Sequence, residues 1–506
     1  MVFKLSLKLN IASTYFSQIY NGFIGIIVMP IFLLNMGSEA YGLIAIFTLV
    51  QAWFALLDAG ISQSVSRQTA RYYAGTLTSQ DYCNLYNGLH VAFLFICSFV
   101  LVLLLTNIDG LARSWLNVKK INNEDISYIL GIIFVCVFMR CIGGLYRGVI
   151  NGAEKIVWLS FFNIALATLR FVLVIPYLYL YDFQILKYFE YQFFIALFEY
   201  IILFWKKNNL IPKNKINIKQ SLIEVRKNKA FIINIGIAST IWLLISQFDK
   251  LLLSKYVSLS DYGYYSMAVM LASIILLCSS PIGNAILPRL TNLISREKKE
   301  EAISIYMQLT KFVCIIITMV GFIIILNINQ VLLTWIGDLS SKKYIEDTII
   351  FYILGNIFLV LSNFPYYLQY AVGDLKYHMR GNLILASIMI PSMFLAVLNY
   401  GVNGAGLVWL IINFLWFLVW PYFIHKIFFQ KIYNTWMLSI VVTGFYILFL
   451  NLGLSLIGRE ILNENYSRMA NFIYLIILGL INLLVVVIFS KKIREFILIK
   501  FRVLKS

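Results

Sequence analysis

Long apolar runs separated by short polar stretches follow one another along almost the entire chain. A helix that crosses a membrane needs about 20 predominantly apolar residues. Fourteen runs of about that length lie near residues 11–34, 41–60, 86–107, 127–148, 157–181, 187–205, 230–254, 262–287, 311–334, 348–372, 380–398, 403–424, 434–457 and 470–490. The pattern predicts an all-α integral membrane protein with about 14 transmembrane helices.

Several short motifs occur twice in the chain, in the same order and about 221 residues apart. Tyr41-Gly42 recurs as Tyr262-Gly263, and Gly152-Ala153-Glu154-Lys155 recurs as Gly373-Asp374-Leu375-Lys376. Because each copy holds six spans, an even number, both copies enter the membrane from the same side, which predicts two parallel six-helix lobes. The predicted boundaries are 1–205 for the N-terminal lobe, 206–229 for a basic cytoplasmic linker, 230–428 for the C-terminal lobe, and 429–506 for two additional helices and a basic cytoplasmic tail.

Charge is scarce and unevenly distributed along the chain. Hydrophobic residues make up 61% of it and charged residues only 13%, about half the charged share of a soluble protein. Lys and Arg accumulate on the cytoplasmic side of membrane proteins. With both termini placed inside, the inside segments hold 29 of them and the outside loops hold 10. This bias predicts cytoplasmic termini and accounts for most of the +18 net charge, so we do not expect nucleic-acid binding.

Polar side chains form a stripe along the first predicted span. Gln18, Asn21 and Gly25 recur in steps of three and four, which places them on one helix face. Span seven holds the corresponding place in the repeat and carries a similar stripe of Asn234, Ala238, Trp242, Ser246 and Asp249. The plain alternative is helix packing through small and polar residues, but we expect Gln18, Asn21 and Trp242 to line a substrate cavity.

Three arginines lie within or beside the apolar runs. Arg140 and Arg147 share one face of span four, and Arg170 lies near the middle of span five. Arginine in a membrane is costly unless it faces water or a partner, so we expect all three to line a cavity that binds anions. A structural ion pair with Glu199 is the alternative. Counting about 1.5 Å per residue from the inner helix ends places Arg170 about 20 Å deep and Glu199 about 9 Å deep, which argues against their contact.

Charged residues at the ends of spans have a separate interpretation. Asp249 and Lys250 lie near the outer end of span seven, where they form either an interfacial charge pair or a gate or coupling-ion site. Arg67 follows span two on a short amphipathic segment, and Arg289 holds the matching place in the second copy. We expect both arginines to lie at the cytoplasmic interface, near lipid headgroups.

Sequence motifs of the common enzyme classes are missing from the chain. It contains no GxSxG, Walker, GxGxxG or HExxH motif. Its six cysteines form no CxxC pair and its three histidines are scattered, so we expect neither a metal nor another cofactor. These features predict a transporter rather than an enzyme. Without an ATP site, transport has to be secondary or downhill, with H⁺ or Na⁺ as the hypothesised coupling ion.

Five ordered motifs carry a resemblance to a known family. They are Met29-Pro30-Ile31-Phe32 with the segment from Met36 to Gly42, the segment from Leu57 to Arg67, Leu145-Tyr146-Arg147-Gly148, Gln247-Phe248-Asp249-Lys250, and Leu287-Pro288-Arg289-Leu290. In this order they are similar to the motifs of bacterial polysaccharide flippases of the multidrug/oligosaccharidyl-lipid/polysaccharide exporter superfamily. The similarity covers roughly residues 10 to 420.

The resemblance implies a V-shaped bundle of two lobes in the bacterial plasma (inner) membrane. It also implies translocation of undecaprenyl-pyrophosphate-linked oligosaccharides, such as O-antigen units for lipopolysaccharide biosynthesis or capsule units, from the cytoplasmic to the outer face by alternating access. Arg140, Arg147 and Arg170 would then bind the pyrophosphate. Membrane lipids and a polysaccharide polymerase are the expected partners. The second copy has Leu361 and Leu368 where Arg140 and Arg147 would recur, which assigns the cationic surface mainly to the N-terminal lobe.

Three other functions are alternatives at this point. A drug/cation antiporter of the same superfamily would be expected to carry an acidic residue in span one or deep in span seven. A major-facilitator sugar porter would carry a GxxxDRxGRR-type loop between spans two and three, which this chain lacks. A membrane glycan polymerase or ligase usually needs a large outside loop, and no predicted outside loop here exceeds about 20 residues.

Overall fold

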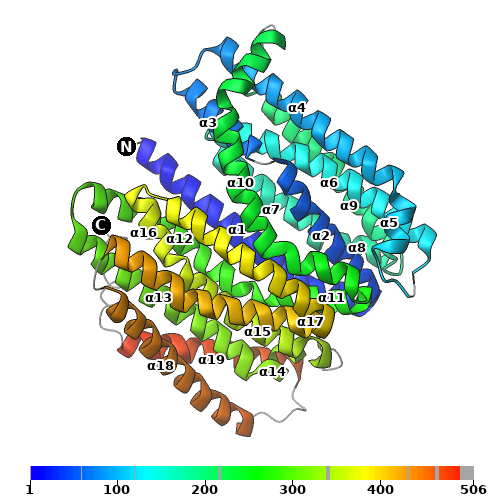
Figure 1. The fold of residues 1–506 in the computed structure, drawn as a ribbon. Coiled ribbons are helices and arrows are strands. Elements are labelled where there is room, and N and C mark those ends of the chain that lie inside the picture. Colours follow the sequence, from blue (N-terminus) through cyan, green and yellow to red (C-terminus); the bar gives the residue numbers. More distant parts are fainter. Residues whose placement is uncertain are drawn as a thin grey trace. The chain divides into compact units, whose positions relative to one another are not determined.

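The computed structural model describes residues 2–58, 60–119, 121–212, 214, 218–337, 342–429, 432–461 and 467–489. Within these ranges every element longer than an isolated bridge is a helix (Figure 1), which confirms the expected all-α fold class. The elements are α1 (Val2–Met36), α2 (Ser38–Asp58), α3 (Ile61–Tyr73), α4 (Ser79–Thr106), α5 (Ile108–Ser114), α6 (Asn123–Gly152), α7 (Ile156–Ala167), η1 (Thr168–Val172), α8 (Val174–Tyr179), α9 (Ile185–Asn208), α10 (Ile218–Tyr256), α11 (Leu259–Ala272), α12 (Ile274–Ser295), α13 (Lys299–Leu326), α14 (Ile328–Trp335), α15 (Lys342–Ser362), α16 (Phe364–Val372), α17 (Lys376–Phe428), α18 (Ile432–Ile461) and α19 (Arg468–Phe489).

Eleven helical segments in the described part of the chain are long and apolar enough to cross a membrane. One of them, α17, is two helices joined across a kink at Gly401, and it matches the predicted spans 380–398 and 403–424. The predicted spans 230–254 and 470–490 fall on α10 and α19, in which some side chains lie outside the described set. The chain is therefore a multi-pass membrane protein, and its helices agree with the predicted spans.

The helices divide into two compact units. Unit 1 comprises Met1–Ser266 and Ala386–Val402, and unit 2 comprises Met267–Leu385 and Asn403–Ser506. Helix α10 packs on α4 and α2 within unit 1, although the repeat assigns it to the C-terminal lobe. The lobe boundaries derived from the repeat stay a prediction. The proposed basic tail after residue 489, and linker residues 213 and 215–217, lie outside the described residues.

The two copies of the Tyr-Gly motif meet inside unit 1. A Cβ on Gly42 of α2 would lie 2.3 Å from the carbonyl oxygen of Leu259, four residues before Gly263. A Cβ on Gly263 of α11 would lie 2.4 Å from the carbonyl oxygen of Ser38, four residues before Gly42. The contact is thus reciprocal, and only glycine lets the two helix backbones approach this closely. We call it the glycine crossing.

The segment between α5 and α6 hydrogen-bonds to the first turns of α2 and α11, the two helices of the glycine crossing. The Trp115 indole N–H donates to Ser254 Oγ at 2.9 Å, and the backbone N–H of Leu259 donates to the Asn117 carbonyl at 2.9 Å. The backbone N–H of Lys119 donates to Glu39 Oε1 at 2.7 Å. These bonds join α10, α11 and α2 through one short segment, so they hold the crossing in place.

The two helices that lie outside the repeat dock on unit 2. Helix α18 packs along α13, where the Trp436 indole N–H donates to Thr310 Oγ1 at 3.3 Å. Helix α19 packs along α14, and its first residue, Arg468, donates to the carbonyls of Thr334 and Trp335 at 2.7 and 2.8 Å. These carbonyls belong to the last turn of α14, which has no further helical partners to offer them. Side-chain bonds therefore fix both additional helices in place.

Candidate functional site

The candidate site is built on two helices of unit 1, α6 and α9, which lie side by side (Figure 1). Arg140 on α6 bonds Gln192 on α9, and Arg147 bonds Glu199, so both contacts join residues 52 apart. A constant offset means that the helices run parallel and in register. Because residues seven apart lie on the same face of a helix, the two arginines directly face the glutamine and the glutamate.

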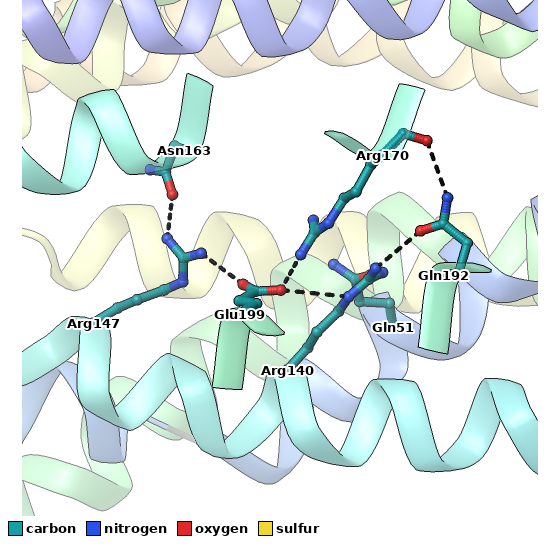
Figure 2. Close-up of polar contacts among 7 residues, drawn as sticks. All are labelled: Gln51, Arg140, Arg147, Asn163, Arg170, Gln192 and Glu199. Atoms are coloured by element: carbon teal, nitrogen blue, oxygen red, sulfur yellow. Dashed lines mark hydrogen bonds and ion pairs between the residues drawn. The ribbon is translucent and has the colours of Figure 1, made fainter. Parts of the chain in front are cut away.

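Glu199 is the centre of this arrangement, and Figure 2 shows all three arginines pointing toward its carboxylate. Arg147 Nη2 donates to Glu199 Oε1 at 2.7 Å. Arg170 Nη2 donates to Glu199 Oε2. Arg140 Nε lies 3.7 Å from the same oxygen, close enough for an ion pair but too far for a hydrogen bond. We call these four residues the arginine cluster.

Neutral amides complete the shell around the arginine cluster. Gln51 Oε1 of α2 and Gln192 Oε1 of α9 accept from Arg140 at 3.0 and 3.3 Å. Gln192 also donates to the Arg170 carbonyl at 3.1 Å, and Asn163 of α7 accepts from Arg147. Side chains from α2, α7 and α9 therefore orient guanidinium groups that belong to α6 and η1.

Arg170 reaches the arginine cluster from a local irregularity in its helix. The chain leaves the α-helix after Ala167 and makes the π-helical turn η1, in which the Leu173 N–H donates to the Thr168 carbonyl at 2.9 Å. Such turns insert an extra residue into a helix and re-aim the side chains around it. Tyr20 of α1 shares a 2.7 Å hydrogen bond with Thr168, which anchors the turn.

The arginine cluster carries an excess of positive charge. Three guanidinium groups and one carboxylate sum to +2. The side chain of Glu199 is 5% exposed and that of Arg140 is 7%, whereas those of Arg147 and Arg170 are 25% and 19% exposed. The buried Nε atoms of Arg140 and Arg170 have no hydrogen-bond partner. Buried donors without acceptors and unbalanced charge are both costly, and an added anion would relieve both costs.

The sequence argument against contact between Arg170 and Glu199 was wrong. It placed them about 11 Å apart in depth, on straight helices measured at about 1.5 Å per residue. Helix α9 continues to Asn208, beyond the predicted end near residue 205. Glu199 is therefore farther from the inner end of its helix than the prediction assumed. The π turn re-aims Arg170, and its long side chain covers the remaining distance. The structural ion pair and the cationic site therefore coexist in one cluster.

The other residues predicted to line a cavity make no described contact with the arginine cluster. Gln18 is exposed on α1, and the amide of Asn21 donates to the Ser17 carbonyl one turn earlier at 2.6 Å. Trp242 of α10 is 42% exposed. Asn234 and Ala238, from the predicted stripe of span seven, have side chains outside the described set. Cavity lining by Gln18, Asn21 and Trp242 stays a prediction.

Asp249 and Lys250 point to different partners. Asp249 is 2% exposed, and its carboxylate accepts from the Tyr265 hydroxyl of α11 at 2.6 Å and from the Lys250 backbone N–H at 2.8 Å. The Lys250 ammonium donates instead to Gln247 Oε1 at 2.9 Å. Asp249 thus links α10 to α11 close to the glycine crossing. A gating or coupling role for this pair stays a prediction.

The two predicted interface arginines lie on different helices. Arg67 is exposed on α3, which begins where Asp58 accepts the Ser62 backbone N–H at 2.7 Å. Arg289 is exposed on α12. Their exposure fits an interfacial position, which stays a prediction. Within the described ranges, no group of three or more His, Cys, Asp or Glu side chains is arranged to hold a metal ion.

The sequence analysis missed the amide partners Gln51, Asn163 and Gln192. A signal for one of them was present, because Gln192 and Glu199 repeat the seven-residue spacing of Arg140 and Arg147 in a span of the same predicted direction. Two parallel helices with equally spaced polar residues favour face-to-face pairing. Gln51 and Asn163 are single polar residues in apolar runs and carry no comparable pattern.

A family model described as "Polysaccharide biosynthesis protein" matches residues 7–294 of the chain. This match covers more than half of the sequence and includes every residue of the arginine cluster. No curated protein sequence matches the chain.

Solved structures share the fold at low sequence identity. A lipid II flippase MurJ in an inward closed conformation is 14% identical, with a TM-score of 0.74 over 97% of this chain and 99% of that chain. An inward-facing multidrug resistance MATE transporter of the MOP superfamily is 16% identical, with a TM-score of 0.63 over 82% of this chain and 96% of that chain. A MOP superfamily transporter from Pyrococcus furiosus gives a TM-score of 0.54 at 14% identity, over 82% of this chain and 95% of that chain. The family match confirms the resemblance to polysaccharide biosynthesis proteins, and the solved structures confirm the fold.

Proposed function

This chain belongs to the polysaccharide biosynthesis protein family, and on that premise we propose that it flips lipid-linked oligosaccharides across the bacterial plasma membrane. The substrate is an undecaprenyl-pyrophosphate-linked repeat unit of a surface polysaccharide such as O-antigen. The sugar and pyrophosphate cross through the protein from the cytoplasmic to the outer face, while the lipid chain stays in the bilayer. The protein alternates between two accessible states without hydrolysing ATP.

The observation that carries the proposal is the charge of the arginine cluster. A diphosphate that is esterified at both ends keeps one ionised oxygen on each phosphorus, and so carries a charge of −2. The cluster carries +2 and holds two buried N–H donors without acceptors. Guanidinium groups bind phosphate oxygens through paired, charge-assisted hydrogen bonds. A bound diphosphate diester would neutralise the site.

Exposure of polar side chains within apolar helices supports access to the site. Gln51 lies well inside α2 and is exposed, yet it bonds Arg140. Arg147 and Arg170 are also partly exposed. Polar groups at membrane depth are tolerated where they border water or protein rather than lipid. A water-filled path that reaches the arginine cluster accounts for all three residues.

The orientation and coupling follow from the sequence and belong to the same proposal. Both termini lie in the cytoplasm, as the excess of inside Lys and Arg favours. An H⁺ or Na⁺ gradient supplies the driving force, with Asp249 and Lys250 as the gate or coupling site. A polysaccharide polymerase receives the flipped unit at the outer face.

Proteoliposomes that contain the purified full-length chain test this function. Three fluorescent substrates are compared: a polyprenyl diphosphate oligosaccharide, the corresponding monophosphate, and a cationic dye. We expect the diphosphate to become accessible on the opposite side at least about tenfold faster than the monophosphate, since removing one charge weakens every contact with the three arginines. Equal rates for the two phosphates, or transport of the dye alone, would contradict the proposal, and the second result would indicate an antiporter.

A further inference from the structure

We propose that Glu199 is an internal counter-anion that holds the arginines in place when the site is empty and lowers their affinity for the bound diphosphate, so that the substrate can leave. This inference rests on the proposed function and concerns the regulation of that same site. It assigns to Glu199 a positioning and release role, which a purely structural ion pair would not have.

The geometry singles out this carboxylate. Both of its oxygens are engaged, Oε1 by Arg147 and Oε2 by Arg170 and Arg140. A structural ion pair needs one cation for one carboxylate, because extra buried charge is penalised. Here three cations share one buried anion (Figure 2), and the surplus has no described counter-charge. Glu199 therefore competes with any bound anion for the three arginines.

Charge balance explains why the competitor is needed. With Glu199 ionised, the empty cluster carries +2 and the complex with a diphosphate diester is neutral. With an uncharged residue at position 199, the empty cluster would carry +3 and the complex +1. The surplus cation would then hold the substrate more tightly, and the three guanidinium groups would lose their common ionic partner.

A transporter must bind its substrate well enough to admit it and weakly enough to release it. Interactions that stabilise only the bound state lower the apparent Kd without speeding the crossing. Partial exposure of Arg147 and Arg170 leaves room for an anion to approach while Glu199 stays buried. Glu199 thereby prevents the arginine cluster from binding the diphosphate too tightly to release it.

The experiment compares E199Q with the wild-type chain in detergent and in proteoliposomes. The binding probe is dimethyl diphosphate with one methyl ester on each phosphorus, a soluble compound with the same −2 charge as the proposed substrate. The matched control is E190Q, which makes the same change on the same helix. Glu190 pairs with Lys187 at 2.8 Å in a partly exposed contact and makes no described contact with the arginine cluster.

We expect E199Q to bind the probe about tenfold or more tightly, because the negative charge that contacts all three arginines is removed. Flipping at saturating substrate should slow, and E190Q should match the wild type in both measurements. Tighter binding is a gain that structural damage does not produce. A folded E199Q protein with unchanged or weaker probe binding would overturn the inference.

Two further variants keep the outcome interpretable. If E199Q fails to fold, E199D retains the charge but withdraws the carboxylate by one methylene, so a smaller gain in affinity is expected and its absence overturns the inference. R140A should weaken probe binding if the proposed function is right. Unchanged binding in R140A refutes the diphosphate site itself, whereas weakened binding in R140A without a gain in the Glu199 variants refutes only the role of Glu199.

Discussion

Ser38 Oγ of α2 lies 2.5 Å from Ser260 Oγ of α11, so the serines just before the two copies of the Tyr-Gly motif hydrogen-bond to one another. The bond lies next to the glycine crossing, where each glycine faces the backbone of the other copy. On the proposed topology both helices start at the outer face of the membrane. The contact therefore lies at that face.

Replacing Gly42 tests the glycine crossing. An added Cβ would meet the Leu259 carbonyl oxygen at 2.3 Å, and a backbone atom cannot move aside as a side chain does. We expect G42A to destabilise the protein by about 1–3 kcal/mol, measured as a lower thermal unfolding midpoint in detergent. The matched control is G444A in α18, where no atom lies within 4 Å of the added methyl group. Equal midpoints for the two variants would show that the helices separate easily.

A covalent bond between the two copies tests whether they separate during transport. Cysteines in place of Ser38 and Ser260 start from hydroxyls in direct contact, and their Cβ atoms are within reach of a disulfide if the backbone adjusts slightly. We expect the oxidised S38C/S260C protein to lose transport and to regain it on reduction, with mass spectrometry confirming the bond. The single variants S38C and S260C should remain active under oxidation. Full activity of the cross-linked protein would exclude opening at this position.

The arginine cluster predicts a graded response to substitution. R140A removes the most buried of the three cations and the bonds to Gln51 and Gln192. We expect it to lower export of surface polysaccharide at least about tenfold, the equivalent of about 1.4 kcal/mol, with normal membrane insertion. R140K should restore only a minor part, because an ammonium lacks the planar fork that reaches several acceptors.

Export is measured with an antibody against the surface glycan, and the amount of inserted protein is measured by immunoblot. R296A, at an exposed position after α12, serves as the control for loss of a positive charge. Wild-type export by R140A and also by R170A would remove the basis for an anionic substrate.

Substitutions at Asp249 and Tyr265 distinguish a coupling role from a gating role. D249N removes the buried charge, and Y265F removes the hydroxyl that donates to it at 2.6 Å but keeps the carboxylate. We expect D249N to weaken the dependence of transport on an imposed H⁺ or Na⁺ gradient, whereas Y265F changes the rate alone. The comparison uses proteoliposomes with each gradient in turn. A D249N protein with wild-type gradient dependence would place the coupling site elsewhere.

Apolar run length predicted the fold class and most helix positions, because a membrane-spanning helix must satisfy its backbone internally and be apolar over about 20 residues. The same logic identified Arg140, Arg147 and Arg170, since a charged side chain at membrane depth must face water or a partner. These predictions depend on the local sequence and on the apolar environment of the membrane.

The partners of the arginines depended on features that local sequence does not contain. Contact between Glu199 and Arg170 requires the π turn at Thr168–Val172 and the longer course of α9, and neither has a clear local signature. Gln51 belongs to a third helix that meets α6 only through tertiary packing. The sequence thus indicated which residues carry the charge, whereas the helix geometry determined what that charge contacts.

The glycine crossing also bears on how the duplicated chain has diverged. Each glycine is constrained by main-chain atoms of the opposite copy, and no substitution there can shrink a carbonyl. A side chain added at Gly42 therefore cannot be accommodated by a change at Gly263, and the converse holds as well. This mutual constraint accounts for glycine at both positions, whereas Arg140 and Arg147 correspond to Leu361 and Leu368 in the second copy.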